Sequence, residues 1–281
     1  MPRNIFYLLI TAILIASCSA QPGTPANQPA VTSIPSVLAS LTLSPAPSST
    51  PMPPTPTPDL IKMVCSPLEG EMLASINEIM TQAFKMPRPG NDDGHQGVDF
   101  SFYRRNEKVG IEGLQVYSAL QGTVVTVINN NWPYGNAVII ETPLESISPE
   151  LISMLQIPSL QPMVMPDPRV NCPAGELSFS LDQEARSLYL LYGHLMERVS
   201  LPVGEKVECG QKIGVVGNTG YSSNPHLHFE TRVGPSSARF DSMAYYTVNS
   251  TVSERYNYCV WRVSNLFQLF DPMTLLSPQE K

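Results

Sequence analysis

The segment Asn224-Pro-His-Leu-His-Phe-Glu-Thr-Arg-Val233 alternates polar and apolar side chains from His226 onward. Successive side chains of a β-strand point to opposite faces of a sheet, so this period of two predicts a strand. Its apolar face, which we expect to face the core, holds Leu227, Phe229, Thr231 and Val233. Its other face holds His226, His228, Glu230 and Arg232. The strand therefore presents two imidazoles to one site, whereas a helix would point them in nearly opposite directions.

The chain has four histidines, and the other two lie in the runs His95-Gln-Gly-Val-Asp99 and Tyr192-Gly-His-Leu195. Histidine is the commonest metal ligand and the side chain best suited to proton transfer near neutral pH. Catalytic zinc typically has three protein ligands and an open position for water, and hydrolysis also needs groups that move protons. The four histidines together with Asp99 therefore indicate a metal-dependent hydrolytic site.

Other classes of function are disfavoured by what the sequence lacks. There is no His-Glu-x-x-His motif, which excludes a zincin-type protease, and no Gly-x-Ser-x-Gly motif, which argues against a serine hydrolase. The net charge is −7 and there is no cluster of lysine or arginine. Nucleic acid is therefore not expected as a partner, because phosphate binding needs concentrated positive charge.

The pattern along the chain predicts a mainly β fold. Short β-rich runs separated by glycine turns are typical of an antiparallel sheet or a barrel-like β domain. We expect strands at 115–119, 123–129, 136–142, 187–192, 212–216 and 226–233. A short helix is expected before this core, over Glu71–Phe84, where apolar side chains recur at helical spacing.

Two long segments interrupt the strands and are predicted to be functional insertions. Residues 143–186 contain seven prolines, and residues 234–264 are rich in tyrosine and contain Trp261. Both are too long for hairpin loops, and long connections in compact domains usually carry function.

Seven short motifs occur in an order that resembles the lysostaphin-type (LytM-like) zinc metalloendopeptidases, which cut peptide bonds in bacterial peptidoglycan. The resemblance covers about residues 90–142 and 187–232. The motifs are His95-Gln-Gly-Val-Asp99, Gly135-Asn-Ala-Val-Ile-Ile140, Tyr192-Gly-His-Leu195, Val203-Gly-Glu-Lys-Val207, Gly210-Gln-Lys-Ile-Gly214, Val216-Gly-Asn-Thr-Gly220 and Pro225-His-Leu-His-Phe-Glu230.

This resemblance implies a role for each candidate residue. His95, Asp99 and His228 match the family's ligands to one zinc ion, and His194 and His226 match its two catalytic histidines that do not bind the metal. It also implies an antiparallel β domain with the site in a groove across the sheet, and peptidoglycan peptides as substrates. The two insertions are expected to wall or cap that groove.

The alternative to an enzyme is a non-catalytic scaffold. Some relatives of this family have lost catalysis and activate a cell-wall amidase, which would then be a partner of this protein. Such relatives lose metal ligands, whereas all five functional positions are present here. The sequence therefore favours the enzyme.

The amino terminus predicts export. Arg3 precedes the apolar stretch Ile5–Ile15, which is shorter than the ~20 residues that a membrane-spanning helix needs but suits a secretory signal peptide. Leu14-Ile-Ala-Ser-Cys18 resembles the lipobox of bacterial lipoproteins. We therefore expect cleavage after residue 17, lipidation of Cys18, and a protein anchored to a membrane in the cell envelope, facing the periplasm or the exterior. The alternative is an ordinary signal peptide with an incidental cysteine.

A linker is predicted to follow, over residues 18–60, before a single domain at 61–281. Residues 19–58 hold eleven of the 28 prolines and no charged residue. Such a composition cannot bury enough apolar surface to fold, so it predicts a disordered spacer, or else a glycosylated stalk.

The remaining cysteines are consistent with an oxidising compartment. Cys65, Cys172, Cys209 and Cys259 are even in number, which predicts two disulfides with three possible pairings. Four buried free thiols are the alternative.

Overall fold

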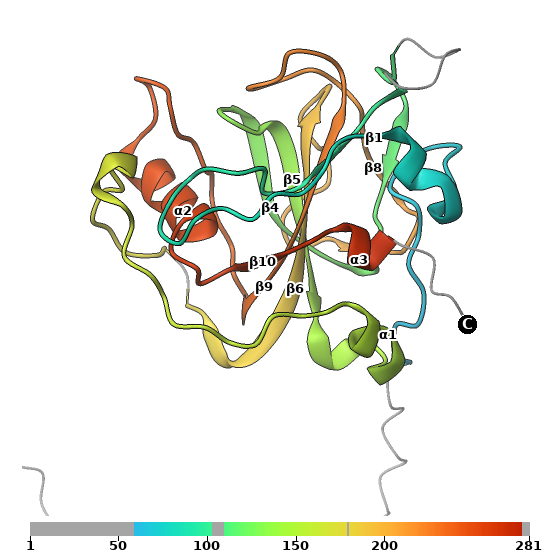
Figure 1. Ribbon diagram of the computed structural model, residues 1–281, viewed down its shortest axis with the longest axis horizontal. Helices are drawn as coiled ribbons and strands as arrows, with labels where there is room; N and C mark the ends of the chain where they lie inside the picture. The colour runs from blue at the N-terminus through green and yellow to red at the C-terminus, as the bar shows by residue number, and fades with distance from the viewer. Residues whose placement is uncertain (1–58, 103–109, 179, 277–281) are drawn as a thin grey trace, which may run out of the picture. The chain divides into compact units, whose positions relative to one another are not determined.

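The computed structural model describes residues 59–102, 110–178 and 180–276, all within one compact unit that spans residues 55–281. Its centre is an antiparallel sheet of eight strands (Figure 1). Along the sheet the order is β1 (Met80–Gln82), β2 (Val98–Phe100), β9 (Leu227–Ser236), β6 (Asp182–Leu195), β5 (Gly135–Pro143), β4 (Gly122–Asn131) and β7 (Lys206–Val207). The eighth strand, β10 (Gln268–Phe270), also pairs with β9.

The predicted signal peptide, Cys18 and nearly all of the predicted linker lie outside the described residues. Among the residues that are described, no helix has both the length and the apolar character to cross a membrane.

The prediction of an antiparallel sheet is confirmed, but the sheet is not a barrel. Its order begins at β1 and ends at β7, and these two strands do not pair with each other in the described part of the chain. Closure requires a continuous ladder of hydrogen bonds around the sheet, and strands of three and two residues are too short to supply it. A separate two-stranded sheet, made of β3 (Gln115–Tyr117) and β8 (Lys212–Val215), lies beside the main one.

All six predicted strands are present, and β9 shows the predicted alternation. Leu227, Phe229 and Val233 belong to the large hydrophobic core, while the side chains of His228, Glu230 and Arg232 interact with one another on the opposite face. All ten residues of β9 are nevertheless buried. The polar face of this strand is therefore covered by other parts of the protein rather than by solvent.

A short helix before the core is present, as predicted, but it is shorter than Glu71–Phe84 and is not an α-helix. Residues Leu73–Ile79 form a 3₁₀-helix, η1, and Met80–Gln82 form strand β1, in which Met80 pairs with Phe100. The apolar side chains of Leu73, Ile76 and Ile79 are three residues apart, a spacing that suits a 3₁₀-helix as well as an α-helix. Met72 at the start of η1 supplies no side-chain cap, and pairing with β2 takes the residues that would extend the helix.

Two hydrophobic cores cover the two faces of the sheet. Alternate residues of β5 divide between them, with Val138 and Ile140 in the larger core and Ala137 and Ile139 in the smaller. The smaller core is formed against α2 (Val252–Arg262), a helix within the predicted insertion 234–264 (Figure 1). The remaining elements are η3 (Leu144–Ser146), α1 (Pro149–Met154), η4 (Pro168–Val170) and α3 (Met273–Leu276).

Two disulfides are present, as predicted, and the alternative of four free thiols is wrong. Cys65 is bonded to Cys209, and Cys172 is bonded to Cys259. Cys172 lies in the segment 143–186 and Cys259 lies in α2, so the second bond joins the two predicted insertions to each other.

We expect removal of the Cys172–Cys259 bond to destabilise the protein. Replacing both residues by serine should lower the free energy of unfolding by about 2–4 kcal/mol, because the bond closes a long loop in the unfolded chain. Urea denaturation measures this difference. In a reducing buffer the variant and the wild type should unfold at nearly the same urea concentration, and a difference that persisted there would show that the substitutions act in another way.

Candidate active site

Strand pairing brings the predicted site residues together from distant parts of the chain. β2 and β9 are antiparallel with Asp99 directly opposite His228, so both side chains lie on the same face. On the other side of β9, Gly193 of β6 is opposite His228, which places His194 beside it. His95 precedes β2, where its backbone pairs with Lys85.

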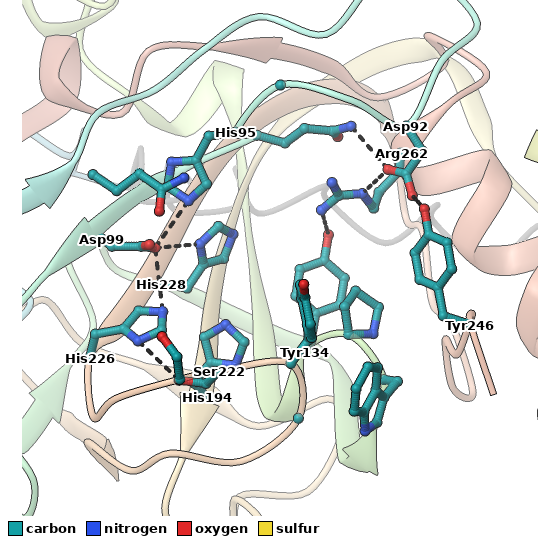
Figure 2. Close-up of a pocket in the computed structure, with 18 of the residues that line it drawn as sticks. Asp92, His95, Asp99, Tyr134, His194, Ser222, His226, His228, Tyr246 and Arg262 are labelled. Atoms are coloured by element: carbon teal, nitrogen blue, oxygen red, sulfur yellow. Dashed lines mark hydrogen bonds and ion pairs between the residues drawn. The ribbon is translucent and has the colours of Figure 1, made fainter.

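Three side-chain atoms converge on one point. The Oδ1 atom of Asp99 lies 3.1 Å from Nε2 of His95 and 2.8 Å from Nδ1 of His228. All three atoms lie within 4.8 Å of one another. Ligands bonded to zinc at 2.0–2.1 Å in a tetrahedron are about 3.3 Å apart, so only small shifts would complete such a centre. Figure 2 shows the three side chains pointing toward one another.

Gly97 makes this convergence possible. A Cβ atom at this position would lie 2.5 Å from the carbonyl oxygen of Phe229 and 2.9 Å from Cε1 of His228. The chain between His95 and Asp99 therefore needs glycine to pass this close to β9.

The surroundings of His228 and His95 suit metal ligands. Nδ1 of His95 lies 3.0 Å from the carbonyl oxygen of Ala83, which can only accept, so this nitrogen carries the proton and Nε2 is left for the site. Nε2 of His228 lies 3.1 Å from the carboxylate of Glu230, an arrangement common behind metal-bound imidazoles. Two imidazoles and a carboxylate form a donor set that zinc commonly takes.

The electrostatics of the site favour a positive charge between His228 and Asp99. Burial lowers the pKa of His228, but hydrogen bonds and charge from Asp99 and Glu230 outweigh it and raise the pKa to about 9. Burial has the opposite effect on Asp99 and raises its pKa. The hydrogen bonds with His228 and His95 outweigh burial and hold this pKa below its usual range. A proton or a metal ion is thus stabilised between the two side chains.

The other two histidines have their rings held by main-chain carbonyls. Nδ1–H of His194 donates to Thr219 over 2.8 Å, and Nδ1–H of His226 donates to Asn224 over 2.7 Å. The Nε2 atom of His226 lies 3.6 Å from Oδ1 of Asp99, farther than the nitrogens of His95 and His228. The two ring centroids are 4.6 Å apart. In each ring the hydrogen bond of Nδ1 therefore fixes the orientation, and Nε2 stays available for proton transfer.

His194 has two further properties of a functional residue. Its φ of 59° is left-handed, which is uncommon for residues other than glycine, and its N–H donates to the carbonyl of Tyr134. Burial lowers the pKa of its imidazole to about 3, so the ring is neutral at pH 7.

The structure thus brings all five predicted residues into one cluster, and the assignment of ligand and catalytic roles among them stays a prediction. Sequence reasoning placed Glu230 on the polar face of its strand but gave it no role. Its carboxylate is fully buried and accepts hydrogen bonds from five side chains, those of Tyr134, His228, Arg232, Trp261 and Arg262. Burial raises the pKa of Glu230, but the charge of Arg232 and the bond from His228 keep it below its usual range, so the group is a carboxylate.

Asp92 connects this network to the wall of the site (Figure 2). Its carboxylate accepts from Nε of Arg262 at 2.6 Å and from the hydroxyls of Tyr246 and Tyr258 at 2.5 and 2.6 Å. Tyr246, Tyr258 and Arg262 all belong to the predicted insertion 234–264. Alternation along β9 could have indicated Glu230, but no local signal identifies residues that reach it from the insertion.

An open cleft of about 1230 Å³ contains the cluster. The insertion 234–264 lines it with three side chains, so the expectation that this insertion walls the groove is confirmed. No described residue of 143–186 lines the cleft, and for this segment the expectation is wrong. Residues 143–186 instead contact α2 and the residues that follow it. Val164 N–H donates to the carbonyl of Ser264, and Cys172 is bonded to Cys259.

An antiparallel sheet thus brings a His–Asp–His donor group that could hold a metal ion and two more imidazoles into one open cleft. Residues 180–240, which contain His194, His226 and His228, match the model described as Peptidase family M23. These residues are thus similar to peptidase family M23, and the lysostaphin-type resemblance of the motifs is confirmed.

Known proteins match parts of the chain. An uncharacterized metalloprotease of Buchnera aphidicola is 51% identical over 39 residues, which are 14% of this chain and 10% of that protein. The catalytic domain of the antimicrobial peptidase lysostaphin from Staphylococcus simulans is 20% identical, with 71% of this chain and 92% of that chain covered and a TM-score of 0.35. A zinc containing peptidase from Vibrio cholerae is 24% identical, with 54% of this chain and 32% of that chain covered and a TM-score of 0.29. The chain therefore spans about a tenth of the first relative and a third of the last.

We expect Glu230→Gln to weaken metal binding. The substitution keeps the size of the side chain but removes the negative charge behind His228, and loss of such a partner typically lowers metal affinity roughly 10–100-fold. Competition with a zinc chelator measures the affinity, and circular dichroism shows whether the variant is folded.

Glu141→Gln is the matched control. Glu141 is also a strand carboxylate that accepts from a tyrosine hydroxyl, that of Tyr189, but it lies outside the cleft. Its variant should bind zinc like the wild type. Equal zinc affinity in a folded Glu230→Gln variant would mean that Glu230 does not support the centre.

Proposed function

We propose that this protein is a zinc-dependent endopeptidase that hydrolyses peptide bonds in bacterial peptidoglycan. The observation that carries the proposal is the convergence of His95 Nε2, Asp99 Oδ1 and His228 Nδ1 beside two histidines whose rings are fixed by carbonyls. The match of residues 180–240 to peptidase family M23 supports the peptidase part. Peptidoglycan as the substrate follows from the lysostaphin-type resemblance of the motifs.

The proposed ligands of zinc are His95, Asp99 and His228. Zinc bound there would polarise the substrate carbonyl and lower the pKa of water near it. Glu230 and the carbonyl of Ala83 hold the two ligand imidazoles in orientation.

His194 and His226 are the proposed proton-transfer residues. With Nδ1–H bound to a carbonyl, each neutral ring keeps an unprotonated Nε2 that can accept a proton from the attacking water. A ring that has taken the proton can then donate it to the departing amine or to the developing oxyanion. Two such rings supply both functions that hydrolysis requires.

We expect His194→Ala to lose turnover and keep the metal, whereas His95→Ala loses both. Removal of a proton-transfer group typically lowers kcat roughly 10²–10⁴-fold. Purified variants should be analysed for zinc and incubated with defined muropeptides, and mass spectrometry should identify the new peptide ends. If His194→Ala lost zinc, His194 would be a ligand and the proposed division of roles would be incorrect.

The same assay separates the enzyme from the amidase-activating scaffold. The wild type should produce new peptide ends, and a chelator should abolish them until zinc is restored. A wild type that bound zinc, cut no muropeptide and accelerated a cell-wall amidase would establish the scaffold instead.

We further propose that a lipid on Cys18 anchors the protein to a membrane in the cell envelope, with the proline-rich residues 19–58 as a spacer. The support is the sequence Leu14-Ile-Ala-Ser-Cys18 after a signal-like apolar stretch. Stable anchoring requires more than one acyl chain, which lipoprotein modification supplies. Cys18→Ala should therefore move the protein from the membrane fraction to the soluble fraction, and a variant that still sediments with membranes would refute the anchor.

A further inference from the structure

Three aromatic side chains are exposed on the described part of the molecule, and all three line the cleft. Trp132 is 40% exposed, Tyr221 is 71% exposed and Tyr246 is 60% exposed. Aromatic side chains of this size are usually buried, and exposed ones that gather at a cleft mark a surface for a ligand.

Trp132 and Tyr221 form a pair that we call the aromatic platform. Their ring centroids are 5.2 Å apart and their planes are tilted by 39°. Trp132 lies in the turn between β4 and β5, and Tyr221 lies in the loop before β9. The platform therefore joins two loops that are almost 90 residues apart in the sequence.

The platform is held in place without a ligand. The N–H of Tyr221 donates to the carbonyl of Pro133, and the N–H of Tyr245 donates to the carbonyl of Trp132, both over 2.8 Å. At Gly220, with a φ of 73°, a Cβ atom would lie 2.3 Å from the nitrogen of Gly135, so the two loops are in direct contact. A rigid surface loses little entropy when a ligand binds.

The platform adjoins the proposed catalytic residues. Two residues beyond Trp132, the carbonyl of Tyr134 accepts the N–H of His194. One residue beyond Tyr221, the hydroxyl of Ser222 lies 3.1 Å from Nδ1 of His226. A group bound on the platform therefore lies next to the bond that the centre would cut.

In the part of the cleft that the described residues form, no unpaired charge lies outside the metal centre. Among the described lining residues outside that centre, the charged side chains are Asp92 and Arg262, and these are paired at 2.6 Å. Neutral hydroxyl and amide groups line the cleft around the platform, including Ser222, Ser223 and Asn224. The lining thus suits a neutral group that has one apolar face and several polar substituents.

A pyranose sugar has this chemistry. One face of the ring presents C–H groups, which are attracted to the negative face of an aromatic ring, and its edge carries hydroxyl and N-acetyl groups. A stem peptide, in contrast, carries free carboxylates or amines that would call for unpaired opposite charges. We propose that the aromatic platform binds an N-acetylated sugar of the glycan chain, so that the protein acts on peptide that is still attached to glycan.

This proposal rests on the proposed function for its substrate, but its binding test does not require catalysis. The probe is the tetramer of N-acetylglucosamine, and isothermal titration calorimetry measures its affinity for the full chain. We expect Trp132→Ala to bind it about tenfold more weakly, the loss of one aromatic contact, and Tyr221→Ala to show a similar loss. Tyr117→Ala, a change of the same type on β3 outside the cleft, should bind like the wild type.

A second arm compares two substrates with the wild type. One is a stem peptide attached to its disaccharide, and the other is the same peptide freed from the sugar. We expect kcat/KM to be about tenfold higher for the attached peptide, and Trp132→Ala to bring the ratio toward one by slowing cleavage of the attached form.

The outcomes distinguish the two proposals. If His95→Ala, which should lack zinc, binds the tetramer like the wild type, and Trp132→Ala does not, the sugar site stands even where no peptide is cut. If the tetramer fails to bind the wild type, or if it binds Trp132→Ala equally well, the sugar site is refuted whatever the peptidase assay shows. If the freed peptide binds through Trp132 while the tetramer does not, the platform is a peptide subsite and the proposal is overturned.

Discussion

The site depends on one register, the pairing of Asp99 in β2 with His228 in β9. Side chains alternate along a strand, so a slip of one residue between these strands would turn one of the two partners to the opposite face. The same register places His95 within reach through Gly97 and, across β9, aligns Gly193 with His228 so that His194 lies beside it. The placement of Asp99, His228 and His194 is therefore a property of the sheet, and His95 and His226 lie just before the strands β2 and β9.

Behind this pair, the structure contains a chain of buried charge. Glu230, Arg232 and Arg262 are each buried or nearly so, and their side chains are bonded to one another, to Asp92 and to Gln96. Buried charges are costly unless they are paired and hydrogen-bonded, and removal of one partner leaves the other charge buried and unpaired. The helix α2 is needed for this balance because it supplies Arg262 and the indole N–H of Trp261. The insertion that carries α2 is thus part of the centre as well as of the cleft wall.

Strand positions were predictable because their signal is local. The alternation from His226 to Val233 was sufficient to place two imidazoles and Glu230 on one face. In segment 71–84 the sequence predicted a helix but not its type or its end. The spacing of Leu73, Ile76 and Ile79 does not distinguish a 3₁₀-helix from an α-helix, and pairing with β2 ends the helix after Ile79. The sequence also did not exclude a barrel, because the length of the edge strands depends on tertiary pairing. Tyr134 and Arg262 meet Glu230 across 96 and 32 residues of sequence, and no local pattern reports such contacts.

The wide separation of the site residues has a consequence for synthesis of the chain. The contact between Asp99 and His228 spans 129 residues, and the contact between Arg262 and Asp92 spans 170. Neither pair can form before both of its residues have been made, and such non-local pairing is intrinsically slow. A growing chain that has reached residue 225 still lacks β9, and one that has reached residue 250 still lacks the helix that neutralises Glu230. The candidate site is therefore complete only after residues 226–262 have been made, and a product truncated before them would lack it.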